Sequence, residues 1–76
     1  MNWIQVLFKR YGYLEETSQY YAYFIYRGIE FQVNKSDFNV KNRFVVKAFS
    51  EIISERPLTL KESIQIIEEF AHLYGE

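Results

Sequence analysis

The chain has 76 residues, of which 49% are hydrophobic and 20% aromatic, and its formal net charge is −1. This composition excludes a disordered chain, and the length leaves room for a single domain. The absence of cysteine excludes disulfides and thiolate metal sites. Together with the lack of a secretory signal it favours a cytoplasmic protein, and no stretch approaches the ~20 apolar residues of a membrane span.

The first element is expected over residues 3–11 as a helix. Asn2 can cap its start, apolar residues follow at helical spacing, and Gly12 can close its end in a left-handed conformation. The same residues also alternate like a strand, which is the alternative, but the start and stop signals agree with the helical period. Residues 13–18 are expected to form a polar connection or the frayed start of the first strand.

Residues 20–34, YYAYFIYRGIEFQVN, predict an aromatic β-hairpin that turns at Arg27 and Gly28. Gly28 supplies the positive φ that hairpin turns need. A two-residue loop gives three apolar cross-strand pairs on one face, Tyr26 with Ile29, Phe24 with Phe31 and Ala22 with Val33. The opposite face then carries Tyr21, Tyr23, Ile25, Glu30, Gln32 and Asn34. A slip of one residue would exchange the two faces.

Two helices are expected in the rest of the chain. The first follows a capping cluster of Ser36, Asp37 and Asn39, and its apolar residues recur at i, i+1, i+4, i+5, i+8 and i+9, namely Phe44, Val45, Ala48, Phe49, Ile52 and Ile53. Pro57 requires it to stop by Arg56. The capping box from Thr59 to Glu62 begins the second, which Gly75 ends. The short connection between them predicts antiparallel neighbours.

The expected fold is therefore a small α+β domain spanning residues 1–76 in the order α-β-β-α-α. An antiparallel hairpin packs on a C-terminal antiparallel helix pair. The order β-β-β-α-α, with a strand in place of the first helix, is the alternative.

Residues suited to catalysis or metal binding are few. His72 is the single histidine and falls on the polar face of the last helix, where it can pair weakly with Glu68. Glu15 and Glu16 are adjacent carboxylates on a polar connection, where such pairs are usually solvated. The sequence contains no glycine-rich phosphate-binding loop. We therefore expect no enzyme, no cofactor, no metal site and no small-molecule substrate.

A basic segment at 35–47 suggests nucleic-acid binding as one candidate function. Its cations are Lys35, Lys41, Arg43 and Lys47, of which Arg43 and Lys47 would share a helical face. Tyr21 and Tyr23 nearby could stack on bases. The pI of about 5.8 weighs against this interpretation, because such domains are usually basic.

The second face of the hairpin is the stronger functional feature. In one interpretation the N-terminal helix folds back with Trp3, Leu7 and Phe8 to bury it, and the sheet lies between helices on both sides. In the other it stays exposed and binds a partner, because tyrosine-rich patches favour protein interfaces. A self-complementary version would give a two-fold homodimer.

The sequence thus predicts a small non-enzymatic interaction module that acts as an adaptor, regulator or inhibitor of a cellular or defence protein. The expected contacts are Tyr21, Tyr23, Ile25 and Arg27, with Glu30 and Gln32 at the rim. The enrichment in Phe, Tyr, Ile, Asn and Lys is what AT-rich codons would give, which favours a low-GC bacterium or one of its phages as the source. Nucleic-acid binding through residues 35–47 is the alternative.

Overall fold

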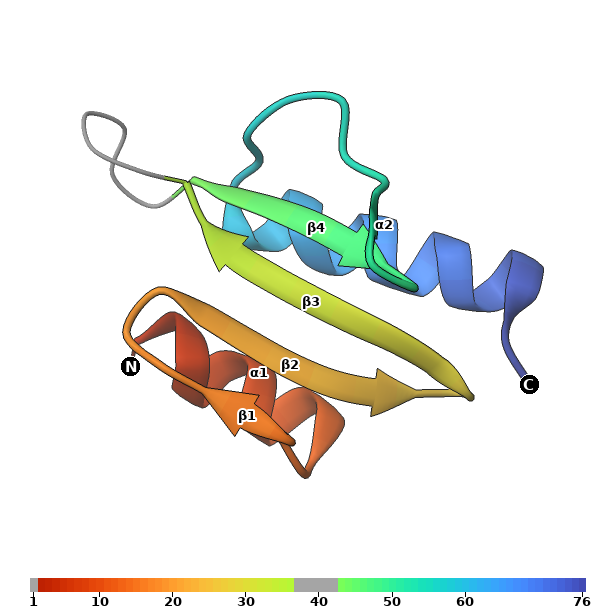
Figure 1. The fold of residues 1–76 in the computed structure, drawn as a ribbon, viewed down its shortest axis with the longest axis horizontal. Coiled ribbons are helices and arrows are strands. Elements are labelled where there is room, and N and C mark those ends of the chain that lie inside the picture. The colour runs from red at the N-terminus through yellow and green to blue at the C-terminus, as the bar shows by residue number, and fades with distance from the viewer. Residues whose placement is uncertain (1, 37–42) are drawn as a thin grey trace.

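The computed structural model describes residues 2–36 and 43–76 and shows an α+β fold, which confirms the predicted class (Figure 1). The elements are α1 (Trp3–Tyr11), β1 (Glu16–Thr17), β2 (Tyr21–Tyr26), β3 (Ile29–Lys35), β4 (Phe44–Ala48), β5 (Glu51–Ile52) and α2 (Leu60–Tyr74). Each strand pairs antiparallel with the next along the chain. The five strands therefore form one meander in sequence order, with β3 in the middle.

The N-terminal segment is a helix, as its end signals predicted. The Asn2 side chain accepts a hydrogen bond from the backbone N–H of Gln5 at 2.9 Å, and the Gln5 side chain accepts one from the Asn2 N–H at 3.0 Å. This capping box satisfies two free backbone donors. At the other end Gly12 has a φ of 85° and donates to the Phe8 carbonyl. Within 13–18 the chain forms the short strand β1.

The β2–β3 hairpin has the predicted register. Its pairs include Tyr26 with Ile29, Phe24 with Phe31 and Ala22 with Val33. Arg27 and Gly28 have φ values of 53° and 79°, so both turn residues are left-handed, as a type I′ hairpin requires. A Cβ on Gly28 would also collide with the Glu76 side chain. The flexible Glu76 side chain can move away, so glycine is needed there for its φ.

The predicted helix over residues 44–53 is wrong, and with it the predicted C-terminal helix pair. These residues form β4 and β5, joined at Phe49 and Ser50. Both periods fit the segment, because Phe44, Val46 and Ala48 also alternate, and all three are buried. After β3 pairs with β2, the backbone N–H and C=O groups on its other edge need partners, and β4 supplies them. The β-branched residues of this segment also favour a strand.

The predicted cap before that helix has no structural counterpart among the described residues. Ser36 follows the end of β3 and its N–H donates to the Arg43 carbonyl. Asp37 and Asn39 lie outside the described residues. After β5 the chain passes Pro57, and Leu58 then pairs with Phe44 through reciprocal backbone hydrogen bonds of 2.7 and 2.8 Å. The predicted capping box at Thr59 starts α2, the one helix after the sheet in the described part of the chain.

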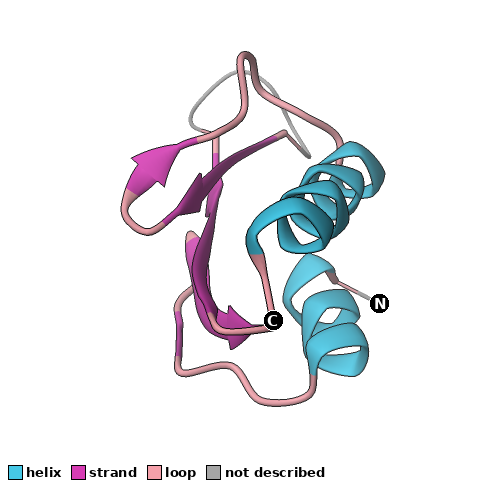
Figure 2. Ribbon diagram, turned by 90° about the vertical axis from the view of Figure 1, so that its right-hand side faces the viewer, coloured by secondary structure: helices cyan, strands magenta, loops and turns pink. Residues whose placement is uncertain are grey.

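Both helices pack on the same face of the sheet (Figure 2). Phe24, Phe31 and Phe44 point from the three central strands into the layer between sheet and helices and are fully buried. Trp3 of α1 lies 5.0 Å from Phe44, and Phe70 of α2 lies 6.0 Å from Phe31, measured between ring centroids. The interpretation in which the sheet lies between helices on both sides is therefore wrong.

Glu68 connects three elements in this layer. Its carboxylate accepts a hydrogen bond from the Tyr11 hydroxyl of α1 at 2.7 Å and one from the Tyr26 hydroxyl of β2 at 2.9 Å. Arg10 lies 3.6 Å away. Burial acts to raise the pKa of Glu68, but these donors outweigh it and lower the pKa below its ordinary value. Burial, and then the bond to Glu68, raise the pKa of Tyr11.

Candidate functional site

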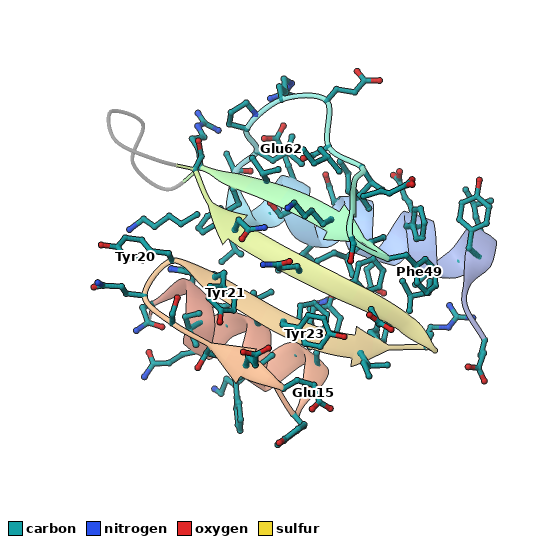
Figure 3. All side chains as sticks on the ribbon, viewed as in Figure 1. Glu15, Tyr20, Tyr21, Tyr23, Phe49 and Glu62 are labelled. Carbon is teal, nitrogen blue, oxygen red and sulfur yellow. The ribbon has the colours of Figure 1, made fainter. Side chains whose placement is uncertain are left out.

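The face of the sheet opposite the helices is not covered by any other element of the described chain (Figure 3). We call it the open face. Its side chains fall in three rows across the strands: Tyr21, Asn34 and Val45; Glu16, Tyr23, Gln32, Lys47 and Ile52; and Ile25, Glu30 and Phe49. Phe49 belongs to the last row because its N–H donates to the Glu30 carbonyl at 2.8 Å.

β2 carries apolar or aromatic side chains on both of its faces, which explains why the open face is partly hydrophobic. Successive side chains of a strand point to opposite faces. Ala22 and Phe24 are fully buried under the helices, whereas Ile25 is 51% exposed on the open face. Phe49 and Ile52 are also more than half exposed, at 53% and 62%. The open face therefore offers large apolar side chains to solvent on both sides of β3.

The two tyrosines of the open face are held by carboxylates. The Tyr23 hydroxyl donates to Glu30 at 2.9 Å, and the Tyr21 hydroxyl donates to Glu16 at 3.3 Å. The bond to Glu30, then burial and the nearby charges of Glu30, Glu15 and Glu16, raise the pKa of Tyr23. These hydrogen bonds limit the rotation of the rings and place negative charge beside them.

Charge is unevenly distributed over the open face. Three glutamates gather around Tyr23 of β2: Glu15 just before β1, Glu16 of β1 and Glu30 of β3. Lys47 lies on the other side of β3, in β4, and is the one cation in the three rows of described residues. The half on β1 and β2 is thus acidic and rich in tyrosine, and the half on β4 and β5 is basic and apolar.

Asn34 stands out near the centre of the open face. Its side-chain oxygen accepts a hydrogen bond from Gln32 at 3.1 Å. Its amide nitrogen is buried and has no hydrogen-bond partner. A buried donor without a partner costs about 1–3 kcal/mol, so this group lowers the stability of the fold. Because atoms of the chain itself bury the nitrogen, it is not available to a partner.

Most residues predicted to contact a partner lie together on this face. Tyr21, Tyr23, Ile25, Glu30 and Gln32 do so, and their role in binding stays a prediction. Arg27 is set apart in the turn, where its side chain donates to the carbonyl of Glu76.

The sequence prediction missed the β4–β5 half of the face. Val45, Lys47, Phe49 and Ile52 were assigned to a helix, so their alignment with Tyr23 was not expected. The alternation of Phe44, Val46 and Ala48 was the signal that could have found them.

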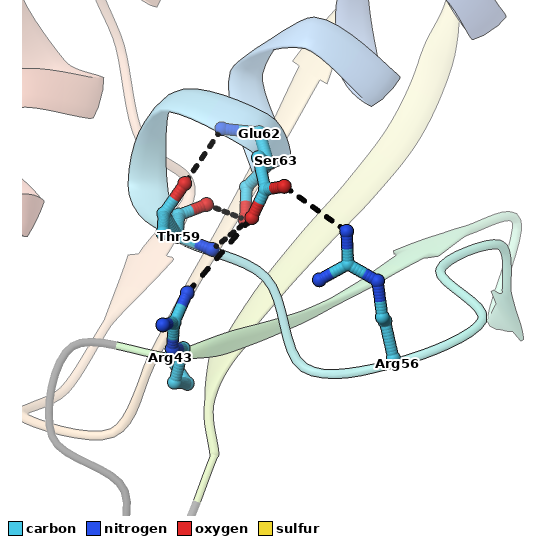
Figure 4. A network of polar contacts seen from close by, with 5 residues as sticks. All are labelled: Arg43, Arg56, Thr59, Glu62 and Ser63. Atoms are coloured by element: carbon cyan, nitrogen blue, oxygen red, sulfur yellow. Dashed lines mark hydrogen bonds and ion pairs between the residues drawn. The ribbon is translucent and has the colours of Figure 1, made fainter.

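Of the basic residues proposed for nucleic-acid binding, the three that the structure describes lie in different places. Lys35 ends β3, Lys47 lies in the middle of the open face, and Lys41 lies outside the described residues. Arg43 lies 3.9 Å from Glu62, at the start of α2 (Figure 4). The expectation that Arg43 and Lys47 share a helical face is wrong, because this segment is extended.

Glu62 belongs to the N-terminal cap of α2, and two arginines form ion pairs with its carboxylate. Its carboxylate accepts the Thr59 N–H at 3.0 Å and the Arg56 guanidinium at 3.1 Å (Figure 4). The backbone bond from Thr59, followed by Arg56, lowers the pKa of Glu62. Arg43 and Arg56 are thus engaged in holding the helix start, which leaves them less available to a phosphate.

The single histidine of the sequence lies on the helix α2. His72 is exposed on α2. Within residues 2–36 and 43–76, no three acidic or histidine side chains meet in a way that could hold a metal ion. Neither described helix is long and apolar enough to cross a membrane.

A shallow groove of about 380 Å³ runs beside α2, away from the open face. Its apolar lining comes from Ile53, Leu58, Ile66, Phe70 and Leu73. It is open to solvent, and Glu55, Arg56 and Glu69 complete its lining.

Comparison with known proteins identifies no relative. No model of a protein family matches the chain, and no curated protein or solved structure is detectably similar to it. The fold and the open face therefore define it as a small two-layer α+β protein, and its function must be argued from that face.

Proposed function

We propose that this protein is a small non-enzymatic interaction module that binds a macromolecular partner through the open face, as an adaptor, regulator or inhibitor. One observation carries the proposal. Both helices pack on the same side of the sheet. The side that carries Tyr21, Tyr23 and Ile25 is therefore left uncovered (Figure 3). A small domain whose large apolar residues are left on one sheet face gains by burying them against another molecule.

The chemistry of the open face suits a protein partner. Tyrosine combines a large rigid ring with a polar tip. It is enriched among the interface residues that contribute most of the binding free energy. Tyr23 and Tyr21 are already oriented by Glu30 and Glu16. Ordering them on binding therefore costs less conformational entropy than ordering free side chains.

The sheet edges favour binding through the face over binding through strand addition. The edge strands β1 and β5 have two residues each. Such short strands offer few backbone groups to a further strand. The open face is the larger surface.

Nucleic-acid binding is the weaker candidate. Three carboxylates surround Tyr23, the ring that would stack on a base, and they repel phosphates. A gel-shift titration at several salt concentrations tests this alternative. Binding that weakens steeply with salt and is lost in Lys47→Glu would favour it over a protein partner.

Affinity capture from the native host, followed by mass spectrometry, tests the proposal. The bait variants are wild type, Tyr21→Ala/Tyr23→Ala, and the control Tyr13→Ala/Tyr74→Ala, which removes two exposed tyrosines from elsewhere. We expect wild type and control to retain the same partner and the open-face variant to lose it. Circular dichroism checks that each variant folds.

A partner that the open-face variant still retains would contradict the proposal. If Tyr21→Ala/Tyr23→Ala does not fold, Lys47→Glu replaces it, because this change removes no ring from the face. If a folded Lys47→Glu variant retained the partner, that result would likewise contradict the proposal that the open face is the binding site.

A further inference from the structure

We infer that the occupant of the open face is a second copy of this chain, bound face to face about a two-fold axis that runs along β3. The inference rests on the proposed function, because it names the partner of the same face. It follows from the order of the strands, the rows of side chains and the uneven charge.

The strand order makes the face symmetric about β3. β3 is the middle of five strands, with β2 and β1 on one side and β4 and β5 on the other. A two-fold axis parallel to β3 therefore places β2 of one copy against β4 of the other, and β1 against β5. Each row of side chains meets the same row of the second copy in reverse order. Sheets that pack face to face keep their strands within about 30° of each other, as this arrangement requires.

The middle row becomes complementary under this symmetry. Tyr23 of one copy meets Lys47 of the other, beside the Glu30 that accepts the Tyr23 hydroxyl. An ammonium group over a tyrosine ring and next to a carboxylate gains both a cation–π contact and an ion pair. The symmetry forms this contact twice. Gln32 lies on the axis and meets itself.

The outer rows bring apolar side chains together. Ile25 of one copy meets Phe49 of the other, and Tyr21 meets Val45. Ile25 and Phe49 are each about half exposed in the single chain, at 51% and 53%. Their mutual burial supplies the hydrophobic contribution that the charged contacts lack.

Asn34 also belongs to β3, so an axis along that strand places the Asn34 residues of the two copies opposite each other.

The other face-to-face symmetry does not fit. An axis across the strands would place each strand against its own copy. Lys47 would then meet Lys47, and Glu16 would meet Glu16, in the same row. Like charges placed opposite each other are destabilising. The axis along β3 leaves one contact between like charges, that of the two Glu30 side chains. Lys47 of the opposite copy lies beside each Glu30 and offsets the repulsion.

The outline of the molecule on the side of the open face is comparable in area with a dimer interface. Seen along its shortest axis, the molecule measures 36 by 25 Å, and this view looks onto the open face (Figure 1). A standard stable interface buries about 800 Å² on each partner.

Analytical ultracentrifugation with charge-exchange variants tests the inference. We expect wild type to sediment as a dimer of 9.2-kDa chains. Lys47→Glu and Glu30→Lys should each raise the dimer dissociation constant at least about tenfold. An equimolar mixture of the two should restore the dimer, because every charged pair across the axis is then of opposite sign. Lys61→Glu and Glu69→Lys, exposed on α2, are the matched controls and should dimerise like wild type.

A second measurement does not depend on the charge variants. The chain contains no cysteine, so Gln32→Cys introduces a single thiol on the proposed axis. Because sheets packed face to face lie about 10 Å apart, too far for a direct disulfide, a bismaleimide of about that span is the cross-linker. It should link two copies of this variant and leave Lys61→Cys unlinked. Linkage confined to Gln32→Cys supports the axis, and equal linkage of the two variants counts against it.

The outcomes separate this inference from the proposed function. A wild type that stays monomeric into the millimolar range overturns the dimer, as does a mixture that fails to restore it. If such a monomer still captures a partner through Tyr21 and Tyr23, the occupant is a different macromolecule and the proposed function stands. A dimer that none of the open-face variants alters would place the interface elsewhere and overturn the inference.

Discussion

Glu68 shows how one carboxylate can hold two layers together. It is a residue of α2, yet its two oxygens accept hydrogen bonds from Tyr11 of α1 and Tyr26 of β2. Hydrogen bonds to a charged acceptor are about twice as strong as neutral ones. The side chain is 35% exposed, so solvent screens part of this gain.

We expect Glu68→Gln to lower the free energy of unfolding by about 1–2 kcal/mol at neutral pH. The pKa of Glu68 is lowered in the folded protein from an ordinary value of 4.5. The carboxylate therefore contributes fully above pH 4.5, and this contribution is lost as the pH falls through the lower folded pKa. The difference between wild type and Glu68→Gln should shrink below pH 4.5. Urea unfolding at a series of pH values measures it.

Glu69→Gln is the control for this prediction, because Glu69 is the exposed neighbour of Glu68 on α2. It should change the free energy of unfolding little at any pH. A difference between wild type and Glu68→Gln that does not vary with pH would contradict the assignment of the effect to the carboxylate charge.

At the scale of elements, the β4–β5 turn carries backbone strain. Phe49 and Ser50 have φ values of 51° and 69°, in the left-handed region that glycine and asparagine prefer. Asn-Gly is the favoured pair for such a turn. A bulky aromatic residue kept in this conformation, and 53% exposed, is consistent with a role outside folding.

We expect Phe49→Asn/Ser50→Gly to raise the free energy of unfolding by about 1 kcal/mol and to weaken dimer formation. The reason is that relief of strain stabilises the chain, while loss of the ring removes the contact proposed with Ile25. Chemical denaturation and ultracentrifugation measure the two effects. Phe49→Ala keeps the strained backbone, so it should weaken the dimer without raising the free energy of unfolding. A less stable double variant would instead show that the Phe49 ring belongs to the core.

Local signals in the sequence were sufficient to predict three elements. The caps at Asn2 and Thr59 each depend on side chains three residues away, and both have the predicted geometry. The turn at Arg27 and Gly28 set the β2–β3 register, because a two-residue loop leaves only one pairing. These features need no distant partner.

The segment at 44–53 could not be assigned from local signals. Its apolar residues satisfy a helical and an alternating period together, and its turn lacks glycine. The preference for a strand comes from β3, whose second edge pairs with residues 44–48, and from Leu58, which pairs with Phe44. Such long-range pairing overrides a period within the segment.

At the scale of the whole molecule, the two helices and the sheet share one core. Leu7 is the single buried residue of α1 among those described and is fully buried, and it belongs to the same cluster as Ile67 of α2. The Trp3 ring packs on Phe44 of β4. Detachment of either helix from the sheet would therefore expose the apolar core residues of the other elements to solvent.

We expect Leu7→Ala to lower the free energy of unfolding by about 2–5 kcal/mol, a large part of the stability of a small domain. Trp3 is the single tryptophan, so its fluorescence reports on α1, and circular dichroism reports on the whole fold. Both signals should change in one transition in wild type and in the variant. Leu73→Ala, at a side chain that is 70% exposed, is the control. A fluorescence transition that precedes the loss of dichroism would show that α1 is a separate unit.

The sequence by itself determined the helix caps, the register of the β2–β3 hairpin and the division of β2 into two apolar faces. It could do so because each depends on residues close together in the chain. Only the tertiary structure decided which face of the sheet stays open. That choice depends on whether α1 packs beside α2 or on the other side, and on whether residues 44–53 extend the sheet. Burial of Phe24, Phe31 and Phe44 in the layer between sheet and helices decided both. The opposite face, which carries Tyr21, Tyr23 and Ile25, is left uncovered as a result.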